Sequence, residues 1–146
     1  MEFVNRLVTA LVDLHPWHVL TVHFPIAIST VGLLAIVLAL WRRSDLFEHF
    51  AYFNVILVAI STAVAGLLGL RDHFVRFEGD TPYVSIKIFL GISLLLLASV
   101  TALARRRNPD LLWNGSSRLL YVAAYVSCFL LAAALGFVGG SILYGF

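Results

Sequence analysis

The stretch FAYFNVILVAISTAVAGLLGL, residues Phe50–Leu70, contains no Asp, Glu, Lys or Arg. A helix of about 20 consecutive, mostly apolar residues is long enough to cross the roughly 30 Å hydrocarbon core of a bilayer. The stretch is therefore predicted to be a membrane-spanning helix. The polar residues Arg71, Asp72 and His73 follow it directly and are expected to end it, which places His73 in a surface loop.

Three further segments pass the same test, so the predicted spans are residues 19–41, 50–70, 82–104 and 118–140. Thr81 is placed to cap the third helix, and Pro82 suits its first position because the ring sets φ near the helical value. The uncharged run of the last span continues to the end of the chain. Its glycines are expected to leave the bilayer as irregular or packed backbone; they are Gly136, Gly139, Gly140 and Gly145.

The amino-acid composition is typical of a membrane protein. The 146 residues are 61% hydrophobic and 12% charged, whereas a typical soluble domain has about 25% charged residues. The length leaves room for one domain, so residues 1–146 are predicted to form a single all-α, integral membrane four-helix bundle. The cations are scattered between apolar runs, so the chain has no electrostatic footprint for nucleic acid. Cys128 is the only cysteine, which excludes a disulfide framework.

Residues 1–15 form a separate amphipathic segment. Polar and apolar residues alternate there at helical spacing, which predicts a short helix lying in the membrane interface. The polar face is Glu2, Asn5, Arg6, Thr9 and Asp13, and the apolar face is Phe3, Val4, Leu7, Val8, Leu11 and Leu14. The alternative is a short extension of the first span. A cleavable signal peptide is not expected, because the order of basic, apolar and small residues is missing.

The distribution of cations predicts the orientation in the membrane. An even number of spans places both termini on one side, and cytoplasmic connections carry an excess of Lys and Arg. The first and third connections contain Arg42, Arg43, Arg105, Arg106, Arg107 and Arg118; the other side contains Arg6, Arg71, Arg76 and Lys87. Both termini are therefore expected to be periplasmic, in a bacterial inner membrane. Interfacial aromatic belts are expected at Trp41, Tyr52, Trp113 and Tyr121 and at Trp17, Tyr83 and Tyr144.

Histidines are the main candidates to carry chemistry. His15, His18 and His23 occur within nine residues where the first span begins, and His23 is about 10 Å along the helix if Pro16 opens it. Ionisable residues at such depth are functional candidates. Pro25 has no N–H and so frees a carbonyl one turn earlier, which is suited to orient the ring of a metal-ligating His23. The alternative is a structural kink, with His23 bonded to a neighbouring Ser or Tyr.

The residues around His23 are suited to a tetrapyrrole. His73 is the candidate second metal ligand, while Arg71 and Lys87 lie on the same side as cations for its carboxylates. Haem b is the expected cofactor, a chlorophyll or bacteriochlorophyll is a weaker candidate, and a cofactor-free protein is the alternative. His15 and His18 share one face and are either part of the site or simply solvated. Lys87 has the alternative role of forming a salt bridge to an acidic residue of the preceding loop: Asp72, Glu78 or Asp80.

Small residues recur every four positions in two of the spans. They are Ser61, Ala65 and Gly69 in the second span, and Ala124, Cys128, Ala132, Gly136 and Gly140 in the fourth. Such stripes let helices approach closely, either within the bundle or against another subunit. There is no catalytic Ser/His/Asp set, phosphate loop or zinc spacing, so the chain is not expected to be an enzyme.

The motif His15-Pro16, His18 and Val22-His23-Phe24-Pro25-Ile26-Ala27 resembles the start of a bacterial family of four-helix membrane proteins of unknown function. Their first helix opens with HP followed by VHFPIAL. The resemblance extends to Ala65-Gly66-Leu67 and to the ending Gly139-Gly140-Ser141-Ile142-Leu143-Tyr144. Members are sometimes joined to, or encoded near, Rieske and cytochrome modules, which implies a setting in membrane electron transfer. The family often has a histidine near the start of its third helix, where this chain has Lys87.

The resemblance and the histidines together predict an integral membrane subunit of an electron-transfer, photosynthetic or respiratory complex. Its partners are then the lipid bilayer and other membrane protein subunits. The alternative is a cofactor-free structural or assembly subunit of a larger membrane complex. A small transporter ranks lower, because the spans contain no carboxylates and no broken inverted repeats.

Overall fold

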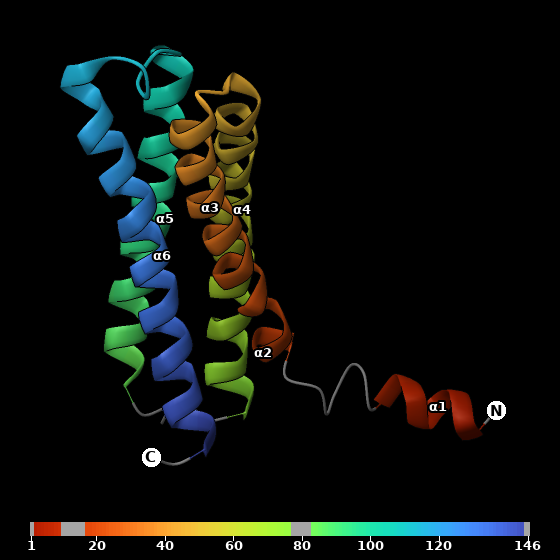
Figure 1. Cartoon of the computed structure of the whole chain (residues 1–146). Coiled ribbons are helices and arrows are strands. Elements are labelled where there is room, and N and C mark those ends of the chain that lie inside the picture. The colour runs from red at the N-terminus through yellow and green to blue at the C-terminus, as the bar shows by residue number, and fades with distance from the viewer. Residues whose placement is uncertain (1, 10–16, 77–82, 145–146) are drawn as a thin grey trace.

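The computed structural model describes residues 2–9, 17–76 and 83–144, and all its elements are helices (Figure 1). They are α1 (Glu2–Thr9), α2 (Trp17–Thr21), α3 (His23–Arg42), α4 (Asp45–Arg76), α5 (Val84–Arg107) and α6 (Gly115–Tyr144). Four stretches are long and apolar enough to cross a membrane: Trp17–Arg42, Asp45–Val75, Val84–Arg107 and Gly115–Ser141. The predicted all-α bundle of four membrane helices is therefore confirmed.

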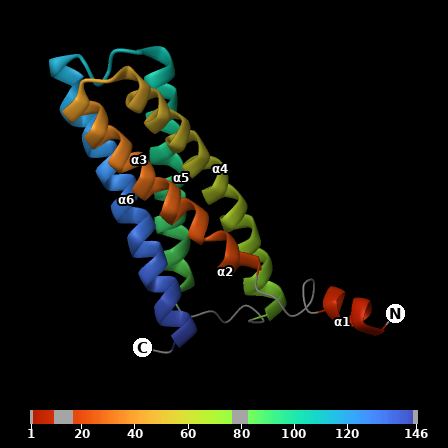
Figure 2. The same cartoon turned by 45° about the vertical axis from the view of Figure 1, so that its right-hand side comes forward.

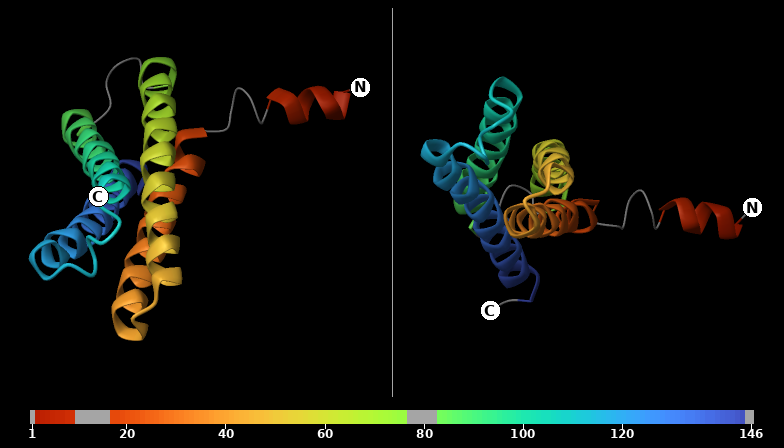
Figure 3. Two further views of the ribbon diagram at one scale, coloured as in Figure 1. Left: turned by 90° about the horizontal axis from the view of Figure 1, so that it is seen from above. Right: turned by 45° about the horizontal axis from the view of Figure 1, so that its top comes forward.

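The four long helices form a closed ring. α4 packs between α3 and α5, and α6 completes the ring by packing against α5 and α3 (Figure 3). Successive helices run in opposite directions, so α2 begins and α6 ends at the same end of the bundle (Figure 1). We call this the terminal end, and we call the end that holds the α3–α4 and α5–α6 connections the connecting end.

Each long helix turns one seam of residues inward, at alternating spacings of three and four. The buried seams are Pro25, Ser29, Gly32, Ile36 and Ala39 in α3; Glu48, Ala51, Val55, Val58, Thr62, Ala65 and Asp72 in α4; Leu94, Ala98, Thr101 and Arg105 in α5; and Tyr121, Tyr125, Cys128 and Ala132 in α6. This repeat is typical of knobs-into-holes packing in helical bundles. It accounts for the ring, because every helix has one narrow face suited to its neighbours.

Small residues allow close contact at several points along these seams. A Cβ added to Gly32 would lie 3.3 Å from Cβ of Asn54, and one added to Gly136 would lie 2.8 Å from Cδ1 of Ile26. In α6 the predicted small stripe therefore packs within the bundle as far as Gly136. A Cβ at Gly139 or Gly140 would have no neighbour within 4 Å.

The first span is interrupted between α2 and α3. α2 ends at Thr21 and α3 begins at His23, with Val22 between them in a helical conformation. Pro25 lacks the N–H that would bond the Thr21 carbonyl, so one helical hydrogen bond is missing at this point. The interruption falls where Pro25 predicts it.

One predicted helix end is wrong. α4 does not stop at Leu70 but continues to Arg76, so His73 lies in a helix and not in a loop. The reason is that Asp72 continues the inward seam and is only 5% exposed, so this polar residue does not require the chain to leave the bundle. In α6 the backbone at Gly136, Gly139 and Gly140 is helical and not irregular, because hydrocarbon offers no other partner for backbone N–H and C=O groups, while Gly136 is packed as expected. Gly145 lies outside the described residues.

The N-terminal helix is separate from the bundle. α1 is not collinear with α2 and lies to one side of the terminal end (Figures 1 and 2). Its polar side is held by an ion pair between Glu2 and Arg6 at 3.0 Å, and Phe3 is 77% exposed. α5 begins at Val84, after Tyr83 in a left-handed conformation (φ 56°). The predicted cap Thr81 and first residue Pro82 lie outside the described residues.

Candidate functional site

His18 is the best-positioned of the predicted site residues. Its ring Nδ1 donates to the carbonyl of Ala65 at 2.8 Å, because a carbonyl oxygen only accepts. Its backbone N–H donates to Oδ2 of Asp72 at 3.3 Å. α2 is thereby bonded to α4 at two points about two helical turns apart. Gly69 makes room for the ring, since a Cβ there would lie 2.9 Å from both Nδ1 and Cε1 of His18.

Lys87, in α5, connects a further helix to this site. Its half-buried ammonium lies 3.4 Å from Nε2 of His18, and an ammonium only donates, so Nε2 is the acceptor. The neutral ring thus bonds Ala65 on one side and Lys87 on the other. We call His18, Asp72 and Lys87 the terminal cluster. It connects α2, α4 and α5 inside an apolar bundle.

Asp72 supplies the negative charge of the terminal cluster. Oδ2 accepts from His18, whereas Oδ1 is buried and has no hydrogen bond from the residues that the structure describes. Nη1 of Arg71 lies 3.6 Å from Oδ1, with the arginine side chain 44% exposed. Among the described residues the carboxylate of Asp72 pairs with Arg71 and not with Lys87, so the predicted salt bridge between Asp72 and Lys87 is not formed. Glu78 and Asp80, the other predicted partners of Lys87, lie outside the described residues.

His23 does not join this cluster. Its side chain is exposed, and Nδ1 donates to the carbonyl of Val19 at 2.7 Å. The sequence predicts that the carbonyl of Thr21 orients the His23 ring. This is wrong, because a histidine side chain on a helix reaches the carbonyl four residues earlier, which is that of Val19. Nε2 has no hydrogen-bond partner among the described residues. Leu20 and Ala27, three before and four after, share its face and are exposed as well.

The remaining predicted residues are dispersed. His73 is half-buried in α4 and meets the ring of Phe74 edge-on, with centroids 5.0 Å apart. His15 lies outside the described residues. Within the described ranges no three His, Cys, Asp or Glu side chains are grouped so as to hold a metal ion. No metal site built from three such side chains is therefore formed by the described residues.

A second buried cluster at the connecting end was not predicted from the sequence. Arg105, at the end of α5, donates from Nη2 to Oε2 of Glu48 at 2.6 Å and from Nε to Oε1. The hydroxyl of Tyr121 donates to Oε1 of Glu48 at 3.2 Å and lies 3.3 Å from the hydroxyl of Tyr125. The Arg105 guanidinium also lies over the ring of Tyr52, 5.3 Å from its centroid. We call Glu48, Arg105, Tyr121 and Tyr125 the connecting cluster.

The spacing of residues along α5 indicates that Arg105, a member of the connecting cluster, faces the inside of the bundle. Arg105 continues the heptad-like series of Leu94, Ala98 and Thr101, so it belongs on the inner seam and not with the exposed Arg106 and Arg107. Tyr121 was predicted to lie in an interfacial aromatic belt, and this is wrong, because it is 4% exposed in the core. Its hydroxyl finds a partner in Glu48, as buried tyrosines require.

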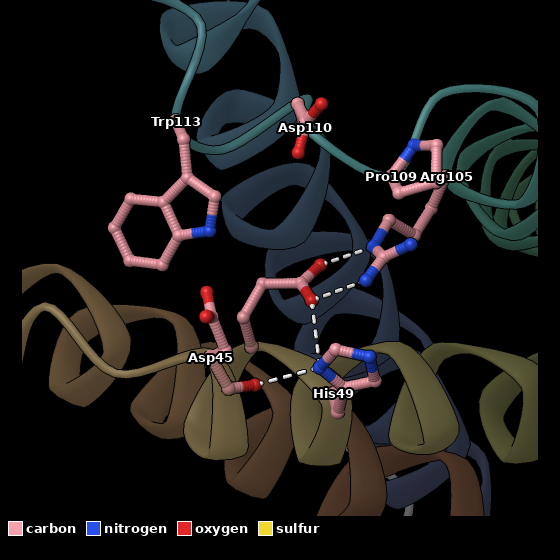
Figure 4. A pocket seen from close by; sticks show the side chains of 7 residues that line it. Asp45, His49, Arg105, Pro109, Asp110 and Trp113 are labelled. Atoms are coloured by element: carbon pink, nitrogen blue, oxygen red, sulfur yellow. Dashed lines mark hydrogen bonds and ion pairs between the residues drawn. The ribbon is translucent and has the colours of Figure 1, made fainter.

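Two members of the connecting cluster, Glu48 and Arg105, line an open pocket of about 370 Å³ (Figure 4). The pocket is lined by Asp45, Glu48, His49, Arg105, Pro109, Asp110 and Trp113. Nδ1 of His49 donates to the carbonyl of Asp45 at 2.8 Å and lies 3.5 Å from Oε2 of Glu48. Both oxygens of Glu48 already accept hydrogen bonds from Arg105, so the carboxylate of Glu48 is not free to bind a ligand in this pocket.

These features define an integral membrane protein of four spans, whose helical bundle is closed near each end by a buried polar cluster. The chain belongs to DUF2231, a family of predicted membrane proteins, and the match covers residues 14–146. Neither the search of curated proteins nor the search of solved structures gave a match.

Proposed function

We propose that the protein is a non-catalytic subunit of a membrane electron-transfer complex, in which His23 presents an imidazole to a cofactor shared with a neighbouring subunit. The proposal places the protein in a bacterial inner membrane with the terminal end on the periplasmic side. Haem b is the cofactor that we favour, ahead of a chlorophyll or bacteriochlorophyll. A haem supplies one-electron transfer when it is bound.

The geometry of His23 is the observation that carries this proposal. Nδ1 is occupied by the Val19 carbonyl at 2.7 Å, which orients the ring and leaves Nε2 directed away from its own helix. Histidines that ligate metals usually bond a carbonyl or carboxylate through their other nitrogen in this way. The orientation needed by a ligand is thus built by the helix itself, without a contribution from the rest of the bundle.

The surroundings of His23 favour a partner outside the chain. His23 is roughly 9 Å along the helix from Trp17, on a face with exposed Leu20 and Ala27. A polar side chain turned toward hydrocarbon is costly when nothing bonds it. A ligand or a second subunit on this face removes that cost. A second axial ligand is then expected from the neighbouring subunit.

The resemblance to a family whose members occur with Rieske and cytochrome modules supports an electron-transfer setting. The cofactor-free structural subunit remains the alternative function. It is favoured by the terminal cluster, because His18 is engaged in bonds within the bundle, through its ring with Ala65 and Lys87 and through its backbone N–H with Asp72.

The test is an absorption spectrum of the complex purified from native membranes in a mild detergent. Wild type should retain a haem spectrum, and His23→Gln should lose at least half of the pigment per complex, because Gln hydrogen-bonds but ligates iron poorly. His49→Gln is the matched control, since exposed His49 makes the same bond to a carbonyl four residues earlier. An assembled wild-type complex without pigment, or equal pigment in both variants, would replace this proposal by the structural alternative.

A further inference from the structure

A second open pocket, of about 760 Å³, lies at the connecting end. It is lined by Leu40 at the end of α3, Arg43 in the α3–α4 connection, Asp45 at the start of α4, Trp113 in the α5–α6 connection and Arg118 in the first turn of α6. It shares Asp45 and Trp113 with the pocket over the connecting cluster, where Figure 4 shows their side chains. The chemistry of its walls differs, because two arginines replace the paired Glu48 and Arg105.

Neither guanidinium group of this pocket is neutralised, and that of Arg118 is held in place by a hydrogen bond. Arg118 donates from Nε to the carbonyl of Leu112 at 3.1 Å, which leaves its terminal nitrogens available. Arg43 has a left-handed backbone (φ 48°, ψ 51°) that ends α3 and turns the chain toward α4. Both side chains are exposed, and neither has a carboxylate within 4 Å in the part of the chain that the structure describes.

The pocket also lies at the depth of a lipid headgroup. Arg43 directly follows the first span, which ends at Arg42, and Arg118 is in the first turns of the last span, which begins at Gly115. Leu40, one turn inside the first span, provides an apolar wall, and tryptophans such as Trp113 favour the headgroup region. One pocket therefore combines an apolar side toward the hydrocarbon with two cations toward the water.

We propose that this pocket binds the phosphate of an anionic phospholipid of the phosphatidylglycerol type. Arginine forms bidentate hydrogen bonds to phosphate oxygens, and basic pockets between membrane helices bind anionic headgroups. Asp45 is the only acidic residue of the lining, so the lining keeps a net positive charge. Its carboxylate accepts hydrogen bonds, which suits the hydroxyls of a glycerol headgroup and distinguishes this lipid from one without hydroxyls.

The test compares lipid binding by two double variants of equal charge. Phosphatidylglycerol and phosphatidylcholine with the same acyl chains are titrated into the detergent-purified protein, and the bound lipid is counted by native mass spectrometry. Arg43→Asn with Arg118→Gln should weaken phosphatidylglycerol binding about thirtyfold, at the usual strength of a cation near a lipid surface. Asn is chosen at position 43 because it tolerates a left-handed backbone. Arg106→Gln with Arg107→Gln, which removes two exposed arginines outside the pocket, should change it less than threefold.

Several outcomes would overturn the proposal. Equal loss in the two double variants would indicate diffuse charge attraction, and equal binding of the two lipids in wild type would exclude a headgroup site. Displacement of the lipid by millimolar inorganic phosphate would assign the pocket to a soluble anion. If the first double variant does not fold, Arg118→Gln alone is expected to weaken binding about fivefold; unchanged binding in that variant would also contradict the site.

Discussion

Glu48, in the first turn of α4, and Arg105, in the last turn of α5, form an ion pair with two hydrogen bonds in which the side chains are 1% and 7% exposed. The two residues are far apart in the sequence, and each is the last member of its helix's inner seam at the connecting end. Tyr121 adds a bond from α6 to the same carboxylate. Three of the four long helices therefore meet at one buried charge pair.

Removing the carboxylate should destabilise the bundle. Glu48→Gln leaves the buried guanidinium of Arg105 without its counter-charge, and loss of one partner of a buried pair costs about 3–5 kcal/mol. The measurement is the free energy of unfolding, obtained by titrating sodium dodecyl sulfate into mixed micelles. Glu2→Gln is the control, because its partner Arg6 is exposed and such pairs contribute about 0–1 kcal/mol. Similar losses in the two variants would contradict the structural role of Glu48.

The close packing of His18 against Gly69 predicts that an alanine at position 69 destabilises the protein. A Cβ at position 69 would lie 2.9 Å from the His18 ring, so Gly69→Ala should push the ring off the Ala65 carbonyl and cost about 1–3 kcal/mol. Gly66, in the same helix, has nothing within 4 Å of an added Cβ. Gly66→Ala should therefore be neutral or stabilise the protein by up to about 1 kcal/mol, as alanine does in helices. Thermal unfolding of both variants measures the difference; the same sign and size in both would refute the close packing of His18.

The orientation in the membrane is tested with reporter fusions. With both termini periplasmic, a fusion after Phe146 should be active as a periplasmic reporter, and a fusion after Trp113, in the α5–α6 connection, should be active as a cytoplasmic one. The physical reason is the excess of arginine in the first and third connections. Equivalent signals from both positions would be inconsistent with four spans, and inverted signals would show the opposite orientation.

α1 should lie along the membrane surface. Spin labels at Phe3 and Asn5, on opposite faces of α1, should report different depths, with position 3 in the acyl region and position 5 near the headgroups. The single native cysteine, Cys128, is buried in the bundle, and Cys128→Ala removes any background label. Accessibility to oxygen and to a water-soluble relaxation agent measures depth. Two labels with identical, fully aqueous accessibility would show that α1 does not bind the membrane.

The sequence by itself determined the features that depend on local composition. The four spans follow from runs of apolar residues long enough to cross a bilayer, the break after Thr21 follows from the missing N–H of Pro25, and α1 follows from its alternating faces. Each depends on residues within one or two helical turns of each other. For the same reason the sequence singled out the start of the first span, where His15, His18 and His23 fall within nine residues.

Only the tertiary structure decided which polar residues meet. His18 and His23 have similar local surroundings, but the packing of α2 against α4 buries the ring of His18 against Ala65 and leaves that of His23 exposed. Arg105 lies next to two exposed arginines in the sequence, yet the seam of α5 turns it alone toward Glu48. Hydropathy and length are properties of one segment. The partner of a side chain depends on which face its helix turns inward, and that is set by the neighbouring helices.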